Sequence, residues 1–156
     1  MQNRHRLDRR RFLTATGLGA IATLGVPGLA AAAEWTAVEK ANVKIVNDMC
    51  AAWSAPLDFD RVGRFLADDC TFRASETSAP VTGRQAIVDT LRKMLGSPEK
   101  AAFEVVQTFA RGPLVVNERF DRFTLPNRSI NWNGVGVFVV RNGAIAEWSD
   151  FAISRG

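Results

Sequence analysis

The stretch from Asn117 to Asp150 reads NERFDRFTLPNRSINWNGVGVFVVRNGAIAEWSD and predicts three consecutive β-strands. Valine, isoleucine, phenylalanine and tryptophan are frequent in it, as is typical of strands. Pro126-Asn127 and Asn142-Gly143 separate the three segments, and an Asn-Gly pair is a strong signal for a two-residue hairpin turn. We therefore expect three neighbouring antiparallel strands in this part of the chain.

The first and third of these strands carry carboxylates among apolar neighbours. Because side chains alternate along a strand, Arg119 and Asp121 share one face of the first strand, and Asp150 shares a face of the third with Trp148. A buried carboxylate is costly unless it is paired, and one guanidinium can bridge two carboxylates. Two acids that share an arginine titrate as a coupled pair, which suits general acid–base chemistry. The alternative is a surface ion pair of small energetic value.

The first 33 residues form a separate segment in this interpretation. Arg9-Arg10-Arg11-Phe12-Leu13 resembles the twin-arginine export motif, and an apolar run over Leu18–Val26 follows it. Ala30–Ala33 then offers cleavage sites of small residues, so residues 1–33 are expected to be a twin-arginine signal peptide. Residues 34–156 are then one domain, exported to the periplasm or secreted by a bacterium. An uncleaved anchor is the alternative, for which the apolar run is short.

The formal net charge of +4 is located in the leader. Five arginines and one aspartate precede residue 34, which leaves 15 basic and 15 acidic side chains in the remainder. The expected mature protein is therefore formally neutral. No charge pattern favours nucleic acid as a partner, and no membrane partner is expected after cleavage.

Histidine, tyrosine and cysteine restrict the chemistry further. The single histidine, His5, lies in the leader, and the sequence has no tyrosine. Histidine-based triads and histidine-ligated metals are therefore excluded from the mature protein, and we expect neither a metal nor a cofactor. Cys50 and Cys70 could form a disulfide in an exported protein, or could be two buried free thiols.

Periodicity predicts helices before strands after the leader. The expected elements are helices over Trp35–Trp53, Arg61–Leu66 and Arg84–Leu95, with strands over Cys70–Ala74 and Ala101–Ala110 and from Leu114 onward. This order predicts an α+β fold, in which three N-terminal helices pack on a curved, mostly antiparallel sheet. Such a sheet forms a cone with an apolar pocket at its open end.

The order of elements over residues 36–155 resembles the nuclear transport factor 2-like fold, which includes SnoaL-like, polyketide-cyclase-like and ketosteroid-isomerase-like members. Within it, the segments DFDRVGRFLADDCTF, GRQAI, VVNERFD and EWSDF are similar to the limonene-1,2-epoxide hydrolase group. That resemblance implies that Asp150 is the base that activates water. It also implies that Asp121 is the acid that protonates the epoxide oxygen and that Arg119 bridges the two.

The sequence departs from this group in its first strand. The group also holds the water with a Tyr and an Asn in that strand and the loop after it, whereas this chain has Thr71–Ser75 there. Phe72 cannot donate a hydrogen bond, and Ser75 is the candidate for the Asn. Aromatic residues on inner faces could line the pocket or fill the core. The candidate substrate-binding residues are Phe72, Ser75, Phe123, Trp132, Phe138 and Trp148.

The expected function is an exported, cofactor-independent epoxide hydrolase that acts on a small apolar substrate. One alternative is a non-catalytic protein that binds a small lipophilic ligand. Another is a proton-transfer enzyme of the ketosteroid-isomerase or cyclase type, although its usual oxyanion donor is a Tyr, which this chain lacks. The oligomeric state stays open, with a homodimer through the outer face of the sheet as one option.

Overall fold

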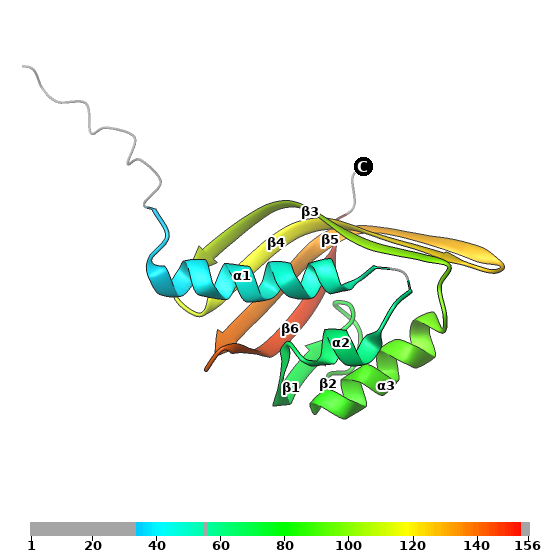
Figure 1. Cartoon of the computed structure of the whole chain (residues 1–156), viewed down its shortest axis with the longest axis horizontal. Coiled ribbons are helices and arrows are strands. Elements are labelled where there is room, and N and C mark those ends of the chain that lie inside the picture. Colours follow the sequence, from blue (N-terminus) through cyan, green and yellow to red (C-terminus); the bar gives the residue numbers. More distant parts are fainter. Residues whose placement is uncertain (1–33, 55, 154–156) are drawn as a thin grey trace, which may run out of the picture. The chain divides into compact units, whose positions relative to one another are not determined.

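The computed structural model describes residues 34–54 and 56–153, so the predicted signal peptide lies outside the described residues. Figure 1 shows long strands with helices beside them. The elements in chain order are α1 (Ala37–Ala52), α2 (Phe59–Gly63), β1 (Leu66–Arg73), β2 (Val81–Thr82), α3 (Arg84–Leu95), β3 (Lys100–Arg111), β4 (Leu114–Leu125), β5 (Arg128–Arg141) and β6 (Ala144–Ala152).

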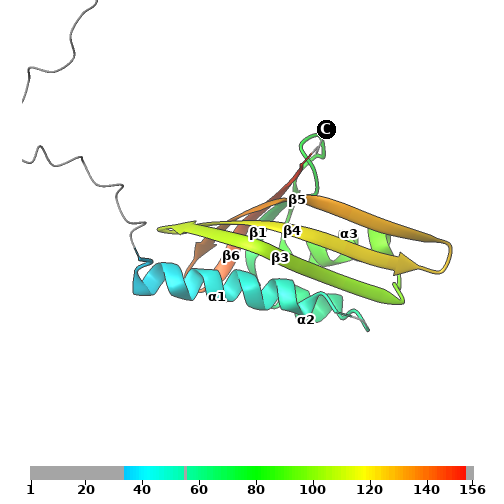
Figure 2. The same ribbon diagram turned by 90° about the horizontal axis from the view of Figure 1, so that it is seen from above.

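All of these strands belong to one open sheet with the order β2-β1-β6-β5-β4-β3. Strands β3, β4, β5 and β6 pair with one another in antiparallel fashion, and Figure 2 shows the long strands β3, β4 and β5 side by side. The predicted antiparallel pairing of the β4 and β5 segments is confirmed, with Phe120 opposite Asn133. Because β1 pairs with β6 in parallel, the sheet is mixed. The α+β class is therefore correct, in a six-stranded sheet that does not close.

Helix α1 begins at a capping box, in which Thr36 and Glu39 each satisfy a backbone N–H of the other. Its apolar side carries Val46 and Met49, which are fully buried, and the helix packs against β3 and β4. Helix α3 lies against β1 and β2 and matches its predicted bounds. None of the described helices has both the length and the apolar character needed to cross a bilayer.

The segment between α1 and α3 differs from the sequence prediction. The second helix was expected over residues 61–66, but α2 ends at Gly63, after Asp58 caps its start. Strand β1 then begins at Leu66 rather than at Cys70, because Leu66 pairs with Ile145 of the distant β6. Strand β2 was not among the expected elements. Local turn signals did not reveal these pairings, which depend on strands far along the chain.

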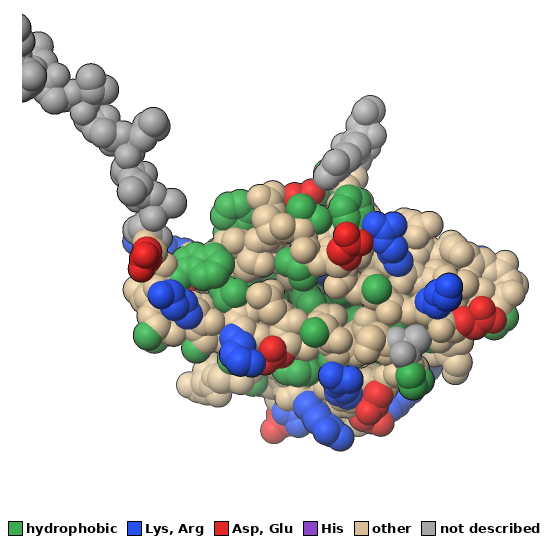
Figure 3. Space-filling model, turned by 45° about the horizontal axis from the view of Figure 1, so that its top comes forward, with side chains coloured by type: hydrophobic (Ala, Val, Ile, Leu, Met, Phe, Trp, Pro, Cys, Tyr) green, Lys and Arg blue, Asp and Glu red, His purple; other side chains and the backbone are tan. Residues whose placement is uncertain are grey.

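The predicted apolar pocket stays a prediction. A surface cavity of about 450 Å³ lies between the α1–α2 connection and the end of α3, away from the predicted catalytic residues. Its lining residues are Pro56, Leu57, Phe59, Arg92, Gly96, Ser97 and Pro98. On the face drawn in Figure 3, acidic and basic side chains are interspersed, without a patch of one sign.

Candidate active site

The inner face of β4 carries an unusual row of buried polar residues. Burial alternates along this strand, so that Asn117, Arg119 and Asp121 point to the same side between Val115 and Phe123. Asn117 and Arg119 are 0% exposed, and Asp121 is 5% exposed. The predicted shared face of Arg119 and Asp121 is therefore confirmed, and the interpretation as a surface ion pair is wrong.

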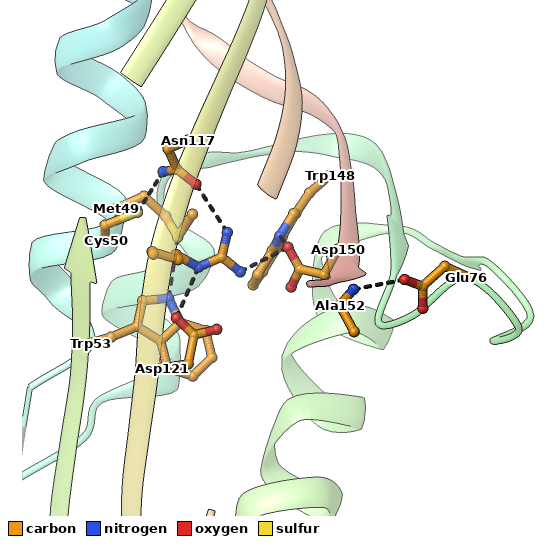
Figure 4. Close-up of polar contacts among 10 residues, drawn as sticks. Met49, Cys50, Trp53, Glu76, Asn117, Asp121, Trp148, Asp150 and Ala152 are labelled. Atoms are coloured by element: carbon orange, nitrogen blue, oxygen red, sulfur yellow. Dashed lines mark hydrogen bonds and ion pairs between the residues drawn. The ribbon is translucent and has the colours of Figure 1, made fainter. Parts of the chain in front are cut away.

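Arg119 donates hydrogen bonds to three different partners. Its Nε donates to Asp121 Oδ1 at 2.9 Å and its Nη2 to Asp150 Oδ1 at 2.7 Å. Its Nη1 donates to Asn117 Oδ1 at 3.1 Å. Figure 4 shows Asn117, Asp121 and Asp150 directed toward the guanidinium from two strands. The structure thus brings together the three predicted catalytic side chains, and their catalytic role stays a prediction.

Strand register explains how Arg119 reaches Asp150 across β5. Gly136 of β5 lies opposite Asn117 on one side and opposite Asp150 on the other. A Cβ atom at residue 136 would collide with Arg119 Nη1. Because glycine has no side chain, it leaves a gap in the inner face of the sheet through which the guanidinium reaches β6.

The two carboxylates receive different numbers of hydrogen bonds. Asp150 Oδ1 accepts from Arg119 Nη2 and also from Trp148 Nε1, at 2.7 Å each. Asp121 accepts from Arg119 alone among the described residues. Within the same part of the chain, neither Oδ2 atom has a protein partner. Each acid therefore keeps one oxygen for a water or a substrate.

Aromatic rings surround the guanidinium. The Arg119 Cζ atom lies 4.6 Å from the ring centre of Phe103, 5.2 Å from that of Trp132 and 5.9 Å from that of Phe138. Trp53, the residue directly after α1, stacks on Phe103 with ring centres 4.4 Å apart. These rings exclude water and offer their negative faces to the cation, which strengthens the electrostatic interactions inside.

Burial sets the protonation of the two acids. Burial, together with the charge of Asp150, raises the pKa of Asp121 to about 7 against the opposing effect of Arg119. Burial also raises the pKa of Asp150, which Arg119 and the Trp148 hydrogen bond counteract. Asp150 accepts two hydrogen bonds and Asp121 accepts one, so hydrogen bonding favours the ionised form more strongly at Asp150 than at Asp121.

Burial lowers the pKa of Arg119, but Asp150 and Asp121 outweigh it and the net pKa is raised. The bridging group therefore stays a cation throughout. In the described residues, no group of three or more acidic, His or Cys side chains could hold a metal ion.

The predicted substrate-binding residues fall into three groups. Phe72, Phe138 and Trp148 are at most 2% exposed, and Phe123 is 6% exposed, so these four belong to the hydrophobic core. Trp132 is half-buried and covers Arg119. Ser75 bonds Ser78 Oγ at 2.6 Å, in the loop after β1, and none of its hydrogen bonds in the described structure goes to the acids.

The two cysteines are separate, buried free thiols in the structure. Cys50 Sγ accepts a hydrogen bond from Asn117 Nδ2 at 3.4 Å. Burial raises the pKa of the Cys50 thiol to about 11 and that of Cys70 to about 12. Neither thiol is therefore ionised at neutral pH, and the alternative of two free thiols is the one found.

Sequence reasoning missed three contributors to the site: Asn117, Gly136 and the Trp148 indole N–H. A signal for the glycine was present, because Gly134 and Gly136 stand two residues apart inside a predicted strand. Interior strand glycines often mark the close approach of another group. Asn117 also falls on the face already assigned to Arg119, two residues before it. The hydrogen bond to Cys50 had no local signal, because the two residues are 67 positions apart.

Comparisons with known proteins support this fold. A model of the SnoaL-like domain family matches residues 46–148, whereas no curated protein matches the sequence. An LEH-like epoxide hydrolase from M. tuberculosis is 26% identical, with a TM-score of 0.62 over 74% of this chain and 84% of that one. A SnoaL-like polyketide cyclase from Jannaschia sp. CCS1 is 13% identical, with a TM-score of 0.66 over 76% and 90% of the two chains. The second likeness concerns the fold alone.

Proposed function

The chain belongs to the SnoaL-like domain family, and on that premise we propose that it is an epoxide-hydrolase-like enzyme. The observation that carries this proposal is the buried bridge from Arg119 to Asp121 and Asp150, in which each acid keeps one oxygen free. An acid and a base opposed in a dry site are suited to open a strained ring with water. The solved LEH-like epoxide hydrolase adds support from a related protein.

In the proposed reaction Asp150 acts as the base. Its Oδ2 removes a proton from a water molecule as the water oxygen bonds to one epoxide carbon. The C–O bond at that carbon breaks, and Asp121 donates its proton to the departing oxygen. Epoxide and water give a diol, and one proton returns from Asp150 to Asp121 through solvent or across the bridge. Arg119 stabilises the negative charge as it moves between the two acids.

The protonation states agree with these roles. The pKa of Asp121, raised by burial to about 7, leaves much of this acid protonated at neutral pH, as a proton donor requires. Hydrogen bonds from Arg119 and Trp148 favour the ionised form of Asp150. A small apolar molecule is the proposed substrate, because Phe103 and Trp132 surround the guanidinium with aromatic rings.

A second candidate function rests on Phe72. Its ring centre lies 4.4 Å from that of Trp148, with the two rings tilted. Phe72 is the nearest candidate in this chain for the Tyr that the limonene-1,2-epoxide hydrolase group has in its first strand. Phenylalanine gives no hydrogen bond to a water, so the water would be oriented by Asp150 alone. A protein that binds a small lipophilic ligand without converting it is the function that this feature favours.

The test is hydrolysis of small cyclic epoxides in water labelled with heavy oxygen, with product analysis by mass spectrometry. Wild type should form labelled diol, and Asp150→Asn should reduce turnover by about 100-fold or more. Asp48→Asn is the control, because this exposed carboxylate only pairs with Lys44 on α1. If wild type opens none of the epoxides but still binds a lipophilic fluorescent probe, the protein is a binder and not a hydrolase.

We also propose that the protein is exported by the twin-arginine route and works outside the cytoplasm. The support is the Arg9-Arg10 pair before Phe12-Leu13 and the small residues up to Ala33. Replacing Arg9 and Arg10 by lysine should leave precursor in the cytoplasm, whereas wild type should start between Ala32 and Trp35. Cell fractionation and N-terminal sequencing decide this, and export of the lysine variant would contradict the route.

A further inference from the structure

Asn117 is a fully buried amide between the proposed site and helix α1. Its Oδ1 accepts from Arg119 Nη1 at 3.1 Å, and its Nδ2 donates to Cys50 Sγ at 3.4 Å. A guanidinium only donates hydrogen bonds, so the amide oxygen has to face Arg119 and the NH2 group has to face the sulfur. The amide therefore has one orientation, which its hydrogen bond to Cys50 of α1 fixes.

The hydrogen bond from Nη1 decides how Arg119 can bind the acids. A free guanidinium prefers to bind a carboxylate with two parallel N–H bonds. Here Nη1 is held by Asn117, so only Nη2 reaches Asp150, and Nε reaches Asp121. The Arg119 contact to each acid is thus a single hydrogen bond, and Oδ2 of each stays available.

The neighbouring sheet is shaped for this arrangement. Gly136 separates Asn117 from Asp150, and a Cβ there would come within 2.8 Å of Asn117 Oδ1 and would overlap Nη1. The guanidinium plane is therefore fixed on one side by the β5 backbone. On the other sides Phe103 and Trp132 cover it.

We propose that Asn117 is a positioning residue, which holds Arg119 between the two acids and prevents it from binding Asp150 with two hydrogen bonds. The kinetic part of this inference rests on the proposed function, whereas the structural part is independent of it. Without the Asn117 oxygen, the Nη1–Nη2 edge of Arg119 turns toward Asp150. Asp150 Oδ2 is then occupied, and Nε moves away from Asp121.

The surroundings of Asp121 make its titration a suitable readout. The charged groups near it are Arg119 on β4 and Asp150 on β6, and the thiol of Cys50 on α1 stays neutral at ordinary pH. Strands β3 and β5 contribute Phe103 and Trp132, which do not titrate. Loss of the Nε hydrogen bond removes a cause that lowers the pKa of Asp121, so its titration midpoint should rise.

The experiment compares Asn117→Leu, which has a similar size and no acceptor, with wild type in the full mature chain. Titration of isotope-labelled aspartate carboxyls is followed by NMR, and Asp121→Asn identifies the Asp121 signal. The midpoint of Asp121 should rise by about 1 pH unit. With the epoxide substrate, kcat should fall by about 10-fold to 100-fold while KM changes little, because orientation of the reacting groups is lost.

Asn42→Leu is the matched control, since Asn42 is a buried amide on α1 that bonds the Gly112 carbonyl at 3.0 Å, outside the site. This variant should lose stability without moving the Asp121 midpoint. If Asn117→Leu does not fold, Asn117→Val, which suits a strand and also lacks an acceptor, replaces it.

The proposal is overturned if the Asn117 variant leaves both the Asp121 midpoint and kcat at the values of the Asn42 control. It is also overturned if only stability changes. If wild type opens no epoxide, the proposed function fails, but the NMR titration still decides whether Asn117 positions Arg119.

Discussion

Two arginines three residues apart on β4 have opposite environments. Arg119 faces inward, is 0% exposed and bonds Asp121 and Asp150. Arg122 faces outward, where its side chain is 54% exposed, and it pairs with Glu104 of β3 at 3.2 Å. Both are arginine–carboxylate pairs across the same sheet. The difference lies in the face of the strand, which decides whether the charges are in water or among aromatic rings.

The comparison teaches that the same ion pair has different value on the two faces. Around Arg122, water screens the two charges and can replace the hydrogen bond between the two side chains. Around Arg119, each charge has lost its hydration, so each depends on its partner, and removal of one partner leaves the others buried and unpaired. A buried bridge of this kind shifts pKa values, which is what acid–base chemistry requires.

The largest expected effect is a difference in folding stability between variants of the two arginines. Arg119→Met should lower the free energy of unfolding at neutral pH by about 3–5 kcal/mol, because it leaves two buried acids without their cation. Arg122→Met should change it by about 1 kcal/mol or less. Urea unfolding followed by circular dichroism measures both. Equal losses for the two variants would show that the faces do not differ as described.

The next effect concerns pH. Burial raises the folded-state pKa of Asp121 from 3.8 to about 7, so the folded protein keeps a proton that the unfolded chain releases. The stability that protonated Asp121 contributes is complete below about pH 4 and is lost as the pH rises toward 7. The free energy of unfolding falls by up to about 1.4 kcal/mol per pH unit in this range. Unfolding at several pH values measures this slope.

Asp121→Asn should flatten the slope, because the amide does not titrate. Glu104→Gln on the outer face should leave it as in wild type. In the enzymatic assay, the same titration predicts that turnover falls as the pH rises through about 7, since Asp121 loses the proton it donates. An unchanged slope in Asp121→Asn would place the titrating group elsewhere.

The smallest effect is the coupling between Arg122 and Glu104. A double-mutant cycle with Arg122→Met and Glu104→Gln should give about 0.2–1 kcal/mol, and high salt should abolish it. The same cycle with Arg119→Met and Asp150→Asn should give a larger value that salt barely changes. A large coupling on the outer face would mean that exposure does not set the value of these pairs.

Several features of the site could be predicted from local sequence. Alternation along β4 placed Arg119 and Asp121 on one face, and the Asn142-Gly143 turn set β5 beside β6. The bounds of α3 followed from apolar periodicity, with glycine at both ends. Each of these features depends on backbone geometry within a few residues, so it can be predicted from the local sequence.

The sequence by itself determined which residue types are available: two acids and an arginine on strands, no tyrosine, and no histidine after His5. Only the tertiary structure decided how they meet. The parallel pairing of β1 with β6, the Gly136 gap and the contact from Asn117 to Cys50 join segments distant in the chain. The shifts of the two acids also depend on burial and on the Trp148 donor, because solvation and hydrogen bonding decide how far a pKa moves from the value that the residue type sets.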